Sequence, residues 1–488
     1  MILRWICERD DKVWLYPIER CIYCKGPITK QKSRKAKVIG ITKVNIPSLM
    51  HPIIPYNIIL LEDEYGNKMP KKTMKDYNIG EDYIVEKAKT ENAVIIKKVK
   101  YDLGESLRSS LELLKFYDIG ENDKVIIKPS IIEPAYGYQA VATNSKILDA
   151  LLPYLKENGV KDVVVAEQAM IGNDTLASAK KSGILDVCKK HNVNFVDLRK
   201  CEYVEKVVDG FIFKIAKDFF DRKIINIPVM KTNSQLGISG AAENMLRVAD
   251  EGTQKRMFAD DIEKTLPRLL KTLPNFLTIG DAIIGLQGQG PTLLGEPAFL
   301  NLLFVSKDPV ALDTIFVEMG LLPTPEYIKE AASLGIGNND VKLMEIVGDE
   351  LEAIKLHLKP AEKGVSAHPR IKLIDGKANP YIFNSALKMT AKLVGLLGEE
   401  INLVIGSEIT KDMVADKKRL VVYGKEAFQK VKEWGIIPLA EIPEDVDDLE
   451  KIMLLKSVLE NPDKKKITVT DKLKSKIMGF GAKIKENF

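Results

Sequence analysis

The chain has 488 residues, too many for one hydrophobic core, and this length predicts about three domains. The composition is 45% apolar and 29% charged, which is ordinary for a folded globular protein. A formal net charge of +5, set against 73 basic and 68 acidic residues, gives no global field that would draw the protein to nucleic acid or to a membrane.

The cysteines and the apolar stretches place the chain in a reducing cytoplasm. Five cysteines in so long a sequence, with no signal-peptide pattern at its start, do not describe a disulfide scaffold. The longest apolar runs, such as residues 53–61 with Pro55 inside, fall well short of the roughly 20 residues that span a bilayer. An excess of Lys, Ile and Glu over Gln is typical of archaeal and thermophilic proteins.

Residues 1–28 contain a candidate metal site. Cys7 and Asp10 are separated by two residues, as are Cys21 and Cys24, and ten residues lie between the two pairs. This spacing is typical of the two knuckles of a zinc ribbon, in which three thiolates and one carboxylate can hold a structural Zn²⁺. A ribbon that has lost its metal, or three unconnected cysteines, explains the pattern equally well.

Residues 29–90 alternate in the manner of short strands, with a turn at Tyr65-Gly66-Asn67, and predict a small β-barrel. Together with Cys21 and Cys24, the segments 41–44 and 55–62 and the strand start at Gly80 resemble the domain of unknown function 35 family, which pairs a ribbon with an OB-fold. The resemblance implies acyl-CoA-handling enzymes as partners. Few aromatic residues are available for base stacking, so we do not expect nucleic-acid binding.

Residues 91–345 switch to strands that alternate with helices, the pattern of a mostly parallel sheet covered on both faces. The predicted strands are 124–130, 162–168, 223–231, 276–283 and 301–308, and the predicted helices are 145–157, 175–190, 242–249 and 311–318. Residues 346–488 predict a second α/β region that ends in a basic tail. The fold class is therefore α/β, preceded by the ribbon and the barrel.

Polar residues follow the predicted strands, and ligands of open α/β sheets bind beyond the carboxyl ends of the strands. They are Lys128, Ser130, Glu167, Lys231, Thr232, Asn233, Asp281, Asp308 and Asp313. A desolvated lysine can bind an anion or act as a base, and a carboxylate can carry a proton or a metal. Pairing among these residues and with loop backbone is the alternative.

Glycines cluster after the strand that carries Asp281. Gly288 and Gly290 lie within Gly285-Leu-Gln-Gly-Gln-Gly-Pro291, where backbone N–H groups could converge on an anion. A tight structural turn is an equal alternative. Gly237 and Gly240 precede a predicted helix and suggest a second anion position at its N-terminus.

The same residues resemble the domain of unknown function 362 family over about residues 120–345. The matching motifs are Lys128-Pro129-Ser130, Lys231-Thr232-Asn233, Gly240-Ala-Ala-Glu-Asn244, Asp281-Ala-Ile-Ile-Gly285, Gly288-Gln-Gly-Pro291 and Asp308-Pro-Val-Ala-Leu-Asp313. Asn233 replaces the usual histidine of the pattern, and Glu243 replaces the usual lysine.

The resemblance also limits the cofactors. The family is distantly similar to nickel-dependent lactate racemases, whose chemistry needs histidines, but none of the four histidines here stands at a matched strand end. Some members carry ferredoxin-like cysteine runs, but no cysteine follows Cys201, so we expect no iron–sulfur cluster.

These patterns predict an enzyme for a small anionic substrate, a carboxylate or an acyl-CoA-like compound. Lys128, Lys231, Asp281 and Asp308 are the candidate catalytic residues, and Ser130, Asn233, Asn244, Gly288 and Gly290 the candidate binding residues. We expect Lys128, Lys231, Asn233, Asn244 and Asp281 to line one pocket, and either lysine to tolerate Met without loss of the fold. A non-catalytic binding or scaffold subunit of an acyl-handling complex is the alternative, and a homo-oligomer is compatible with either.

Overall fold

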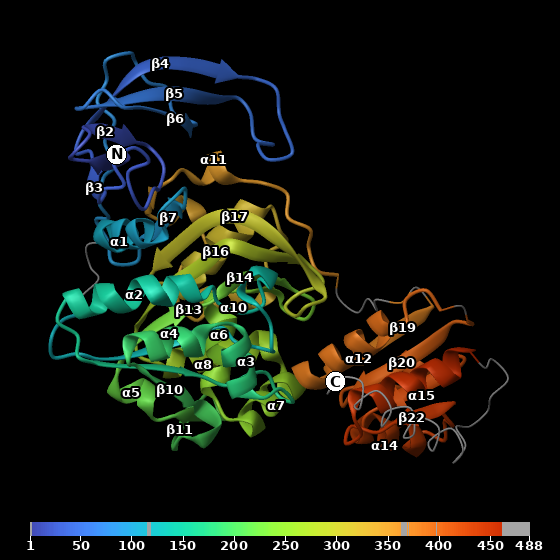
Figure 1. Cartoon of the computed structure of the whole chain (residues 1–488). Coiled ribbons are helices and arrows are strands. Elements are labelled where there is room, and N and C mark those ends of the chain that lie inside the picture. The colour runs from blue at the N-terminus through green and yellow to red at the C-terminus, as the bar shows by residue number, and fades with distance from the viewer. Residues whose placement is uncertain (1, 115–118, 363–367, 369, 397, 461–488) are drawn as a thin grey trace.

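The structure is a computed structural model that describes residues 2–114, 119–362, 368, 370–396 and 398–460. Two small N-terminal sheets lie at one end of a large central sheet, and a third, parallel sheet forms the C-terminal region (Figure 1). The predicted basic tail beyond residue 460 lies outside the described residues. None of the described helices is long and apolar enough to cross a membrane.

The first sheet is the predicted ribbon. Its strands β1 (Leu3–Cys7), β2 (Lys12–Trp14) and β3 (Thr29–Lys32) pair antiparallel in the order β2-β1-β3. Trp5 lies opposite Trp14 across the β1–β2 pair, and the two rings bury Cys7 and Cys21 in one small core. The ribbon is therefore held by indole packing beside its cysteines.

The second sheet corrects the predicted barrel. Strands β4 (Ala36–Val44), β5 (Tyr56–Asp63) and β6 (Lys68–Thr73) form an open antiparallel sheet, and no described strand joins β6 back to β4. Residues 29–32, which fall inside the predicted barrel region, pair with β1 of the ribbon instead. Pro70 and three lysines lie on the free edge strand β6, a composition that keeps an edge from pairing further.

The central sheet has ten strands. Eight of them run in the order β10 (Asn194–Asp197), β9 (Asp162–Glu167), β8 (Lys124–Pro129), β13 (Lys223–Ile227), β16 (Phe276–Gly288), β17 (Gly295–Ser306), β7 (Val94–Lys98) and β18 (Ile346–Gly348), while β14 (Val229–Asn233) pairs with β16 and with β15 (Gly237–Ser239). The first five strands in this order, β10, β9, β8, β13 and β16, are parallel to one another, but β17 is antiparallel to β16. Continuous Val/Ile runs give β8 and β13 apolar side chains on both faces, as a buried strand requires.

Helices cover both faces of this sheet (Figure 1). On one face pack α1 (Leu103–Leu113), α2 (Ser145–Glu157), α3 (Thr175–Lys181) and α4 (Ile184–His191). On the other lie α6 (Ala241–Asn244), α7 (Glu251–Asp260), α8 (Ile262–Thr272), α9 (Pro309–Gly320), α10 (Glu326–Ser333) and α11 (Leu351–Ile354). The short α5 (Asp218–Asp221) and the hairpin of β11 (Tyr203–Val208) and β12 (Phe211–Ala216) complete this layer.

Two predicted elements are each divided in the structure. The predicted strand 223–231 breaks at Pro228, which has no N–H for a ladder, into β13 and β14. The predicted helix 175–190 breaks at Gly183, whose φ is 81°, into α3 and α4. Strand β18 also extends the core sheet past the predicted boundary at residue 345.

The C-terminal region is a four-stranded parallel sheet, β19 (Ile371–Gly376), β20 (Ile401–Gly406), β21 (Leu420–Tyr423) and β22 (Ala440–Ile442). Helices α12 (Pro380–Lys392) and α15 (Asp448–Glu460) pack on one face, and α14 (Lys425–Glu433) packs on the other. The short α13 (Lys411–Val414) connects β20 to β21. This arrangement is the second α/β region that the sequence predicts.

Candidate functional site

The carboxyl ends of β8, β9 and β14 bring together a buried cluster of charged side chains. Lys128 on β8 is fully buried, and its Nζ donates to Glu167 Oε1 at 2.9 Å and to Oε2 at 2.8 Å. Burial lowers the pKa of Lys128 from 10.5 to about 8, and the charge of Glu167 opposes that shift. Lys128 and Glu167 therefore form a closed ion pair inside the core.

Arg247 joins this cluster from the helical turn Met245–Val248. Its Nη1 lies 3.1 Å from Glu243 Oε1, its Nη2 lies 3.1 Å from Asn244 Oδ1, and its Nε lies 3.8 Å from Glu167 Oε1. Burial raises the pKa of Glu243, but the charges of Arg247 and Lys231 outweigh burial and lower it overall. The sequence prediction missed Arg247, although its position four residues after Glu243 on a helix is a signal for an ion pair.

Lys231 is the cation of this cluster that has no carboxylate partner. Its side chain is buried, and its Nζ donates to Val141 O at 3.1 Å and to Ser130 Oγ at 3.4 Å. Among the described residues it makes no ion pair. Burial lowers the pKa of Lys231 from 10.5 to about 8, and the charge of Glu243 opposes that shift. An unpaired buried ammonium is costly, so this position suits a bound anion.

Asp281 supplies a carboxyl group on the neighbouring strand β16. Its Oδ2 accepts from Asn144 N at 2.8 Å and its Oδ1 from Ile283 N at 3.2 Å. Burial raises the pKa of Asp281 to about 6, although these backbone donors and the charge of Lys231 oppose the shift. The pKa values of a carboxyl and an amine thus both move towards neutral pH, which is common at functional sites.

Asn233 and Asn244, two of the predicted binding residues, use their amides inside the protein. Asn233 Nδ2 donates to Ser239 Oγ at 2.9 Å, while its Oδ1 accepts from Gln235 N and Leu236 N. Asn244 Nδ2 donates to Asn226 Oδ1 at 2.7 Å. Both asparagines therefore stabilise the local structure at the edge of the sheet through hydrogen bonds within the protein. Ser130, another predicted binding residue, contacts Lys231 directly.

The glycine loop forms a structural turn. Gly288 N donates to Lys359 O at 2.8 Å, and Gly290 N donates to Gly288 O at 2.7 Å. A Cβ added at Gly290 would lie 2.1 Å from Thr232 O, so glycine is needed there for close backbone packing. Because these two N–H groups are already bonded, they do not converge on an anion as an anion-binding loop would require.

The N-terminus of α6, the second predicted anion position, is filled by Asp313 of α9. Asp313 Oδ1 accepts from Ala241 N at 2.6 Å, and its Oδ2 accepts from Ala242 N at 3.0 Å and from the Tyr327 hydroxyl at 3.0 Å. Burial raises the pKa of Asp313 to about 7 against these donors. A Cβ at Gly240 would lie 2.0 Å from Asp313 Oδ1, so the glycine there admits a carboxylate of the chain itself.

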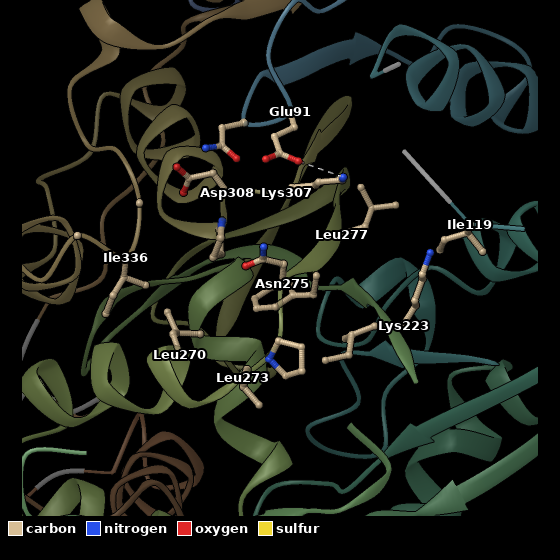
Figure 2. Close-up of a pocket in the computed structure, with 17 residues that line it drawn as sticks. Glu91, Ile119, Lys223, Leu270, Leu273, Asn275, Leu277, Lys307, Asp308 and Ile336 are labelled. Atoms are coloured by element: carbon tan, nitrogen blue, oxygen red, sulfur yellow. Dashed lines mark ion pairs between the residues drawn. The ribbon is translucent and has the colours of Figure 1, made fainter. Parts of the chain in front are cut away.

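Asp308 lies at the opposite edge of the sheet, which corrects its predicted place beside the lysines. The sequence prediction took β17 as parallel, but Ser306 at its end pairs with Thr278 near the start of β16. Asp308 Oδ1 caps α9 by accepting from Val310 N and Ala311 N. Asp308 lines a cavity of about 480 Å³ together with Lys223, Asn275 and Lys307. Figure 2 shows these four side chains around it.

The C-terminal region contacts the loops at the carboxyl edge. Lys388 of α12 pairs with the buried Glu133, and Gln235 Nε2 donates to Ala378 O at 2.9 Å. Asn384 Nδ2 approaches Met170 Sδ at 3.3 Å. The C-terminal region thus packs against the loops that follow β8, β9 and β14.

A second group of residues, in the ribbon, could hold a metal ion. One ligand atom from each of Cys7, Asp10, Cys21 and Cys24 lies within 4.8 Å of all the others. Cys21 Sγ lies 2.9 Å from Asp10 Oδ2, and Cys7 Sγ lies 3.5 Å from Cys24 Sγ. Gly26 N also points to Cys24 Sγ at 3.4 Å, a contact that orients a thiolate ligand. The four predicted ligands therefore converge, and the donor set suits a metal ion.

Comparisons with known proteins agree with part of the predicted family resemblance. Residues 125–318 match the family model described as "Domain of unknown function (DUF362)", which confirms that resemblance over these residues. A solved structure titled "Ltp2-ChsH2(DUF35) aldolase" aligns with 21% of this chain and 76% of that chain, at 14% identity and a TM-score of 0.15, too weak a likeness to support an argument. No curated protein matches the sequence.

Proposed function

We propose that the DUF362 domain of this chain is an acid–base enzyme for a small anionic substrate, a carboxylate or an acyl thioester. The observation that carries this proposal is the buried Lys231, whose ammonium has no ion-pair partner among the described residues. A substrate anion bound beside Nζ would supply the missing charge and offset the cost of burying it.

Each nearby group has a role that follows from its protonation. Lys231, with a pKa of about 8, is mostly protonated at pH 7 and binds the substrate anion, and Ser130 Oγ lies beside it. Asp281, with a pKa of about 6, takes a proton from the substrate and returns it, because a general base works best when its pKa lies near the working pH. Lys128, already bonded to both oxygens of Glu167, positions the neighbouring strand ends.

Hydrogen exchange tests this assignment. We expect the protein to bind at least one of acetate, lactate, malonate and acetyl-CoA, and to exchange a hydrogen next to its carbonyl group in D₂O, as mass spectrometry would show. Lys231→Met should weaken binding about tenfold or more, because it removes a charge-assisted contact. Asp281→Asn should stop exchange and leave binding in place.

Lys146→Met is the matched control, since Lys146 is exposed beside the same edge. It should behave as the wild-type protein does. Equal binding of all four compounds by wild type and Lys231→Met would contradict the proposal.

A non-catalytic binding or scaffold subunit is the second candidate. The saturated Lys128–Glu167 pair and the internally bonded glycine loop favour it, because both are structural features that need no substrate. Anion binding that depends on Lys231, with no exchange on any of the four compounds, would favour this candidate over the enzyme.

We also propose that the ribbon cluster binds structural zinc through Cys7, Asp10, Cys21 and Cys24. Three thiolates and one carboxylate match the tetrahedral preference of Zn²⁺. Cys21→Ser should lower both the zinc content and the melting temperature of the full chain, because metal binding is coupled to folding of the ribbon. Cys201→Ser lies outside the cluster and should change neither property. A zinc-to-protein ratio near zero in zinc-supplemented wild-type protein would rule out the assignment.

A further inference from the structure

A lysine-lined cavity of about 490 Å³ lies between the N-terminal sheets and the central sheet. Its walls come from β1, β6, β7, α1 and α11, and Figure 1 shows β6, β7, α1 and α11 at the end of the core that faces the N-terminal sheets. Seven lysines line it: Lys32, Lys68, Lys71, Lys72, Lys97, Lys98 and Lys100. This cavity is separate from the cluster around Lys231, and an inference about it does not rest on the proposed function.

The carboxylates of the cavity are already engaged. Asp349 pairs with Lys71 at 2.8 Å, and Glu105 pairs with Lys32 at 2.6 Å. Glu350 accepts from Thr73 Oγ1 and Met74 N, both at 2.6 Å, and Asp102 pairs with Lys30 outside the cavity wall. These carboxylates hold the walls of the cavity together, and they leave its other lysines without a negatively charged partner.

Four lysines of the wall have no ion pair within the described ranges. Lys72 Nζ lies 3.3 Å from His51 Nδ1, and Lys100 Nζ lies 3.4 Å from the thioether sulfur of Met69. Lys97 and Lys98 follow each other at the end of β7. Neither a thioether nor a neutral imidazole carries the negative charge that would compensate an ammonium group, so the cavity contains concentrated positive charge.

The electrostatics of these side chains agree with this geometry. Burial, together with the charge of Lys98, lowers the pKa of Lys72 and also that of His51. The pKa of Lys97 falls through burial too, although the charge of Asp349 opposes the shift. Each group would therefore gain from a bound anion, because an opposite charge favours the protonated form.

We propose that this cavity binds a small organic phosphate with at least two negative charges, held by Lys72, Lys97, Lys98 and Lys100. The volume is within the range of small-molecule sites, about 300–1,000 Å³. Leu61, Met69, Tyr83, Val85 and Tyr101 also line the cavity and give the organic part of the ligand an apolar wall. A nucleic-acid strand would need an open groove with stacked aromatic side chains, which fits these walls less well.

Calorimetric titration of the full chain tests the site, with inorganic pyrophosphate and ADP as the two probes. We expect both to bind, ADP more tightly because of the apolar wall, and binding of both to weaken as the salt concentration rises. Lys97→Gln/Lys100→Gln should weaken pyrophosphate binding by about tenfold or more. Its far-ultraviolet circular dichroism should match that of the wild type, because neither lysine makes an ion pair with a described residue.

Two control variants distinguish this cavity from the remaining lysines of the protein. Lys43→Gln, an exposed lysine of the same N-terminal sheet, should bind both probes as the wild type does, as should Lys146→Met, an exposed lysine near the carboxyl edge. The proposal is overturned if pyrophosphate and ADP fail to bind the wild type, or if Lys97→Gln/Lys100→Gln binds them as well as Lys43→Gln does. Tighter binding of a single-stranded oligonucleotide, in competition with pyrophosphate, would instead assign the surface to nucleic acid.

Discussion

Lys128→Met should destabilise the protein by about 3–5 kcal/mol, the usual cost of removing one partner of a buried ion pair. The change leaves Glu167, which is fully buried, without the two hydrogen bonds that Lys128 gives it. Arg247 Nε, at 3.8 Å, is too far away to replace them. For Lys128 this expectation differs from the sequence prediction that a lysine at a strand end tolerates Met, because the sequence did not reveal the Glu167 partner.

The double variant Lys128→Met/Glu167→Leu separates pairing from packing. It removes both charges and should recover much of the lost stability, because a buried ion pair and an apolar pair of similar volume are often equivalent. Denaturant unfolding followed by circular dichroism measures all three proteins, with Lys146→Met as the control. Equal stability of Lys128→Met and wild type would show that the pair contributes nothing.

Lys231→Met should have the opposite effect and stabilise the ligand-free protein at pH 7. The burial that lowers the pKa of Lys231 from 10.5 to about 8 means that the folded state opposes its charge. At 1.36 kcal/mol per pKa unit, removing that charge is worth about 1–3 kcal/mol after allowance for relaxation around the site. A stabilising replacement of a strand-end residue is the behaviour expected where function has been kept at a cost in stability.

The pH dependence identifies the source of this gain. Between pH 8 and 10.5 the unfolded chain keeps the Lys231 proton and the folded chain loses it, so the stability of the wild type rises with pH in that window. The gain from Lys231→Met should therefore be largest below about pH 8 and should shrink towards about pH 10.5. A gain that stays constant across this window would point to packing by the methionine and not to the ammonium charge.

The local sequence determines much of the fold. The predicted helix 145–157 matches α2 (Ser145–Glu157), and the predicted strands 124–130 and 162–168 match β8 and β9 within one residue, because each is a continuous apolar pattern with clear polar ends. The direction of a strand in the sheet, in contrast, is not determined by the local sequence. Nothing within residues 301–308 tells whether β17 runs with β16 or against it, since that choice depends on the short connection, residues 289–294, that follows β16.

The candidate site was predictable only in part for the same reason. Strand ends place Lys128, Lys231 and Asp281 near the carboxyl edge of the sheet, where all three are buried. That they line one pocket stays a prediction. Which lysine has a partner depends on the register of β8 against β9, which brings Glu167 within reach of Lys128. The reversal of β17 takes Asp308 away from this edge. The ribbon is simpler, because the spacing of its four ligands already specifies the two knuckles that bring them together.

Because β17 is reversed, substitutions at the two edges of the sheet should change the free energy of unfolding independently of each other. Asp308 caps α9 at one edge, Lys231 lies at the other, and they share no hydrogen-bond partner among the described residues. Free-energy changes at such separated positions usually add within about 0.3–0.5 kcal/mol. Natural substitutions at the cavity around Asp308 can therefore accumulate without altering the energetics around Lys231, so the two edges of one sheet are free to diverge independently in evolution.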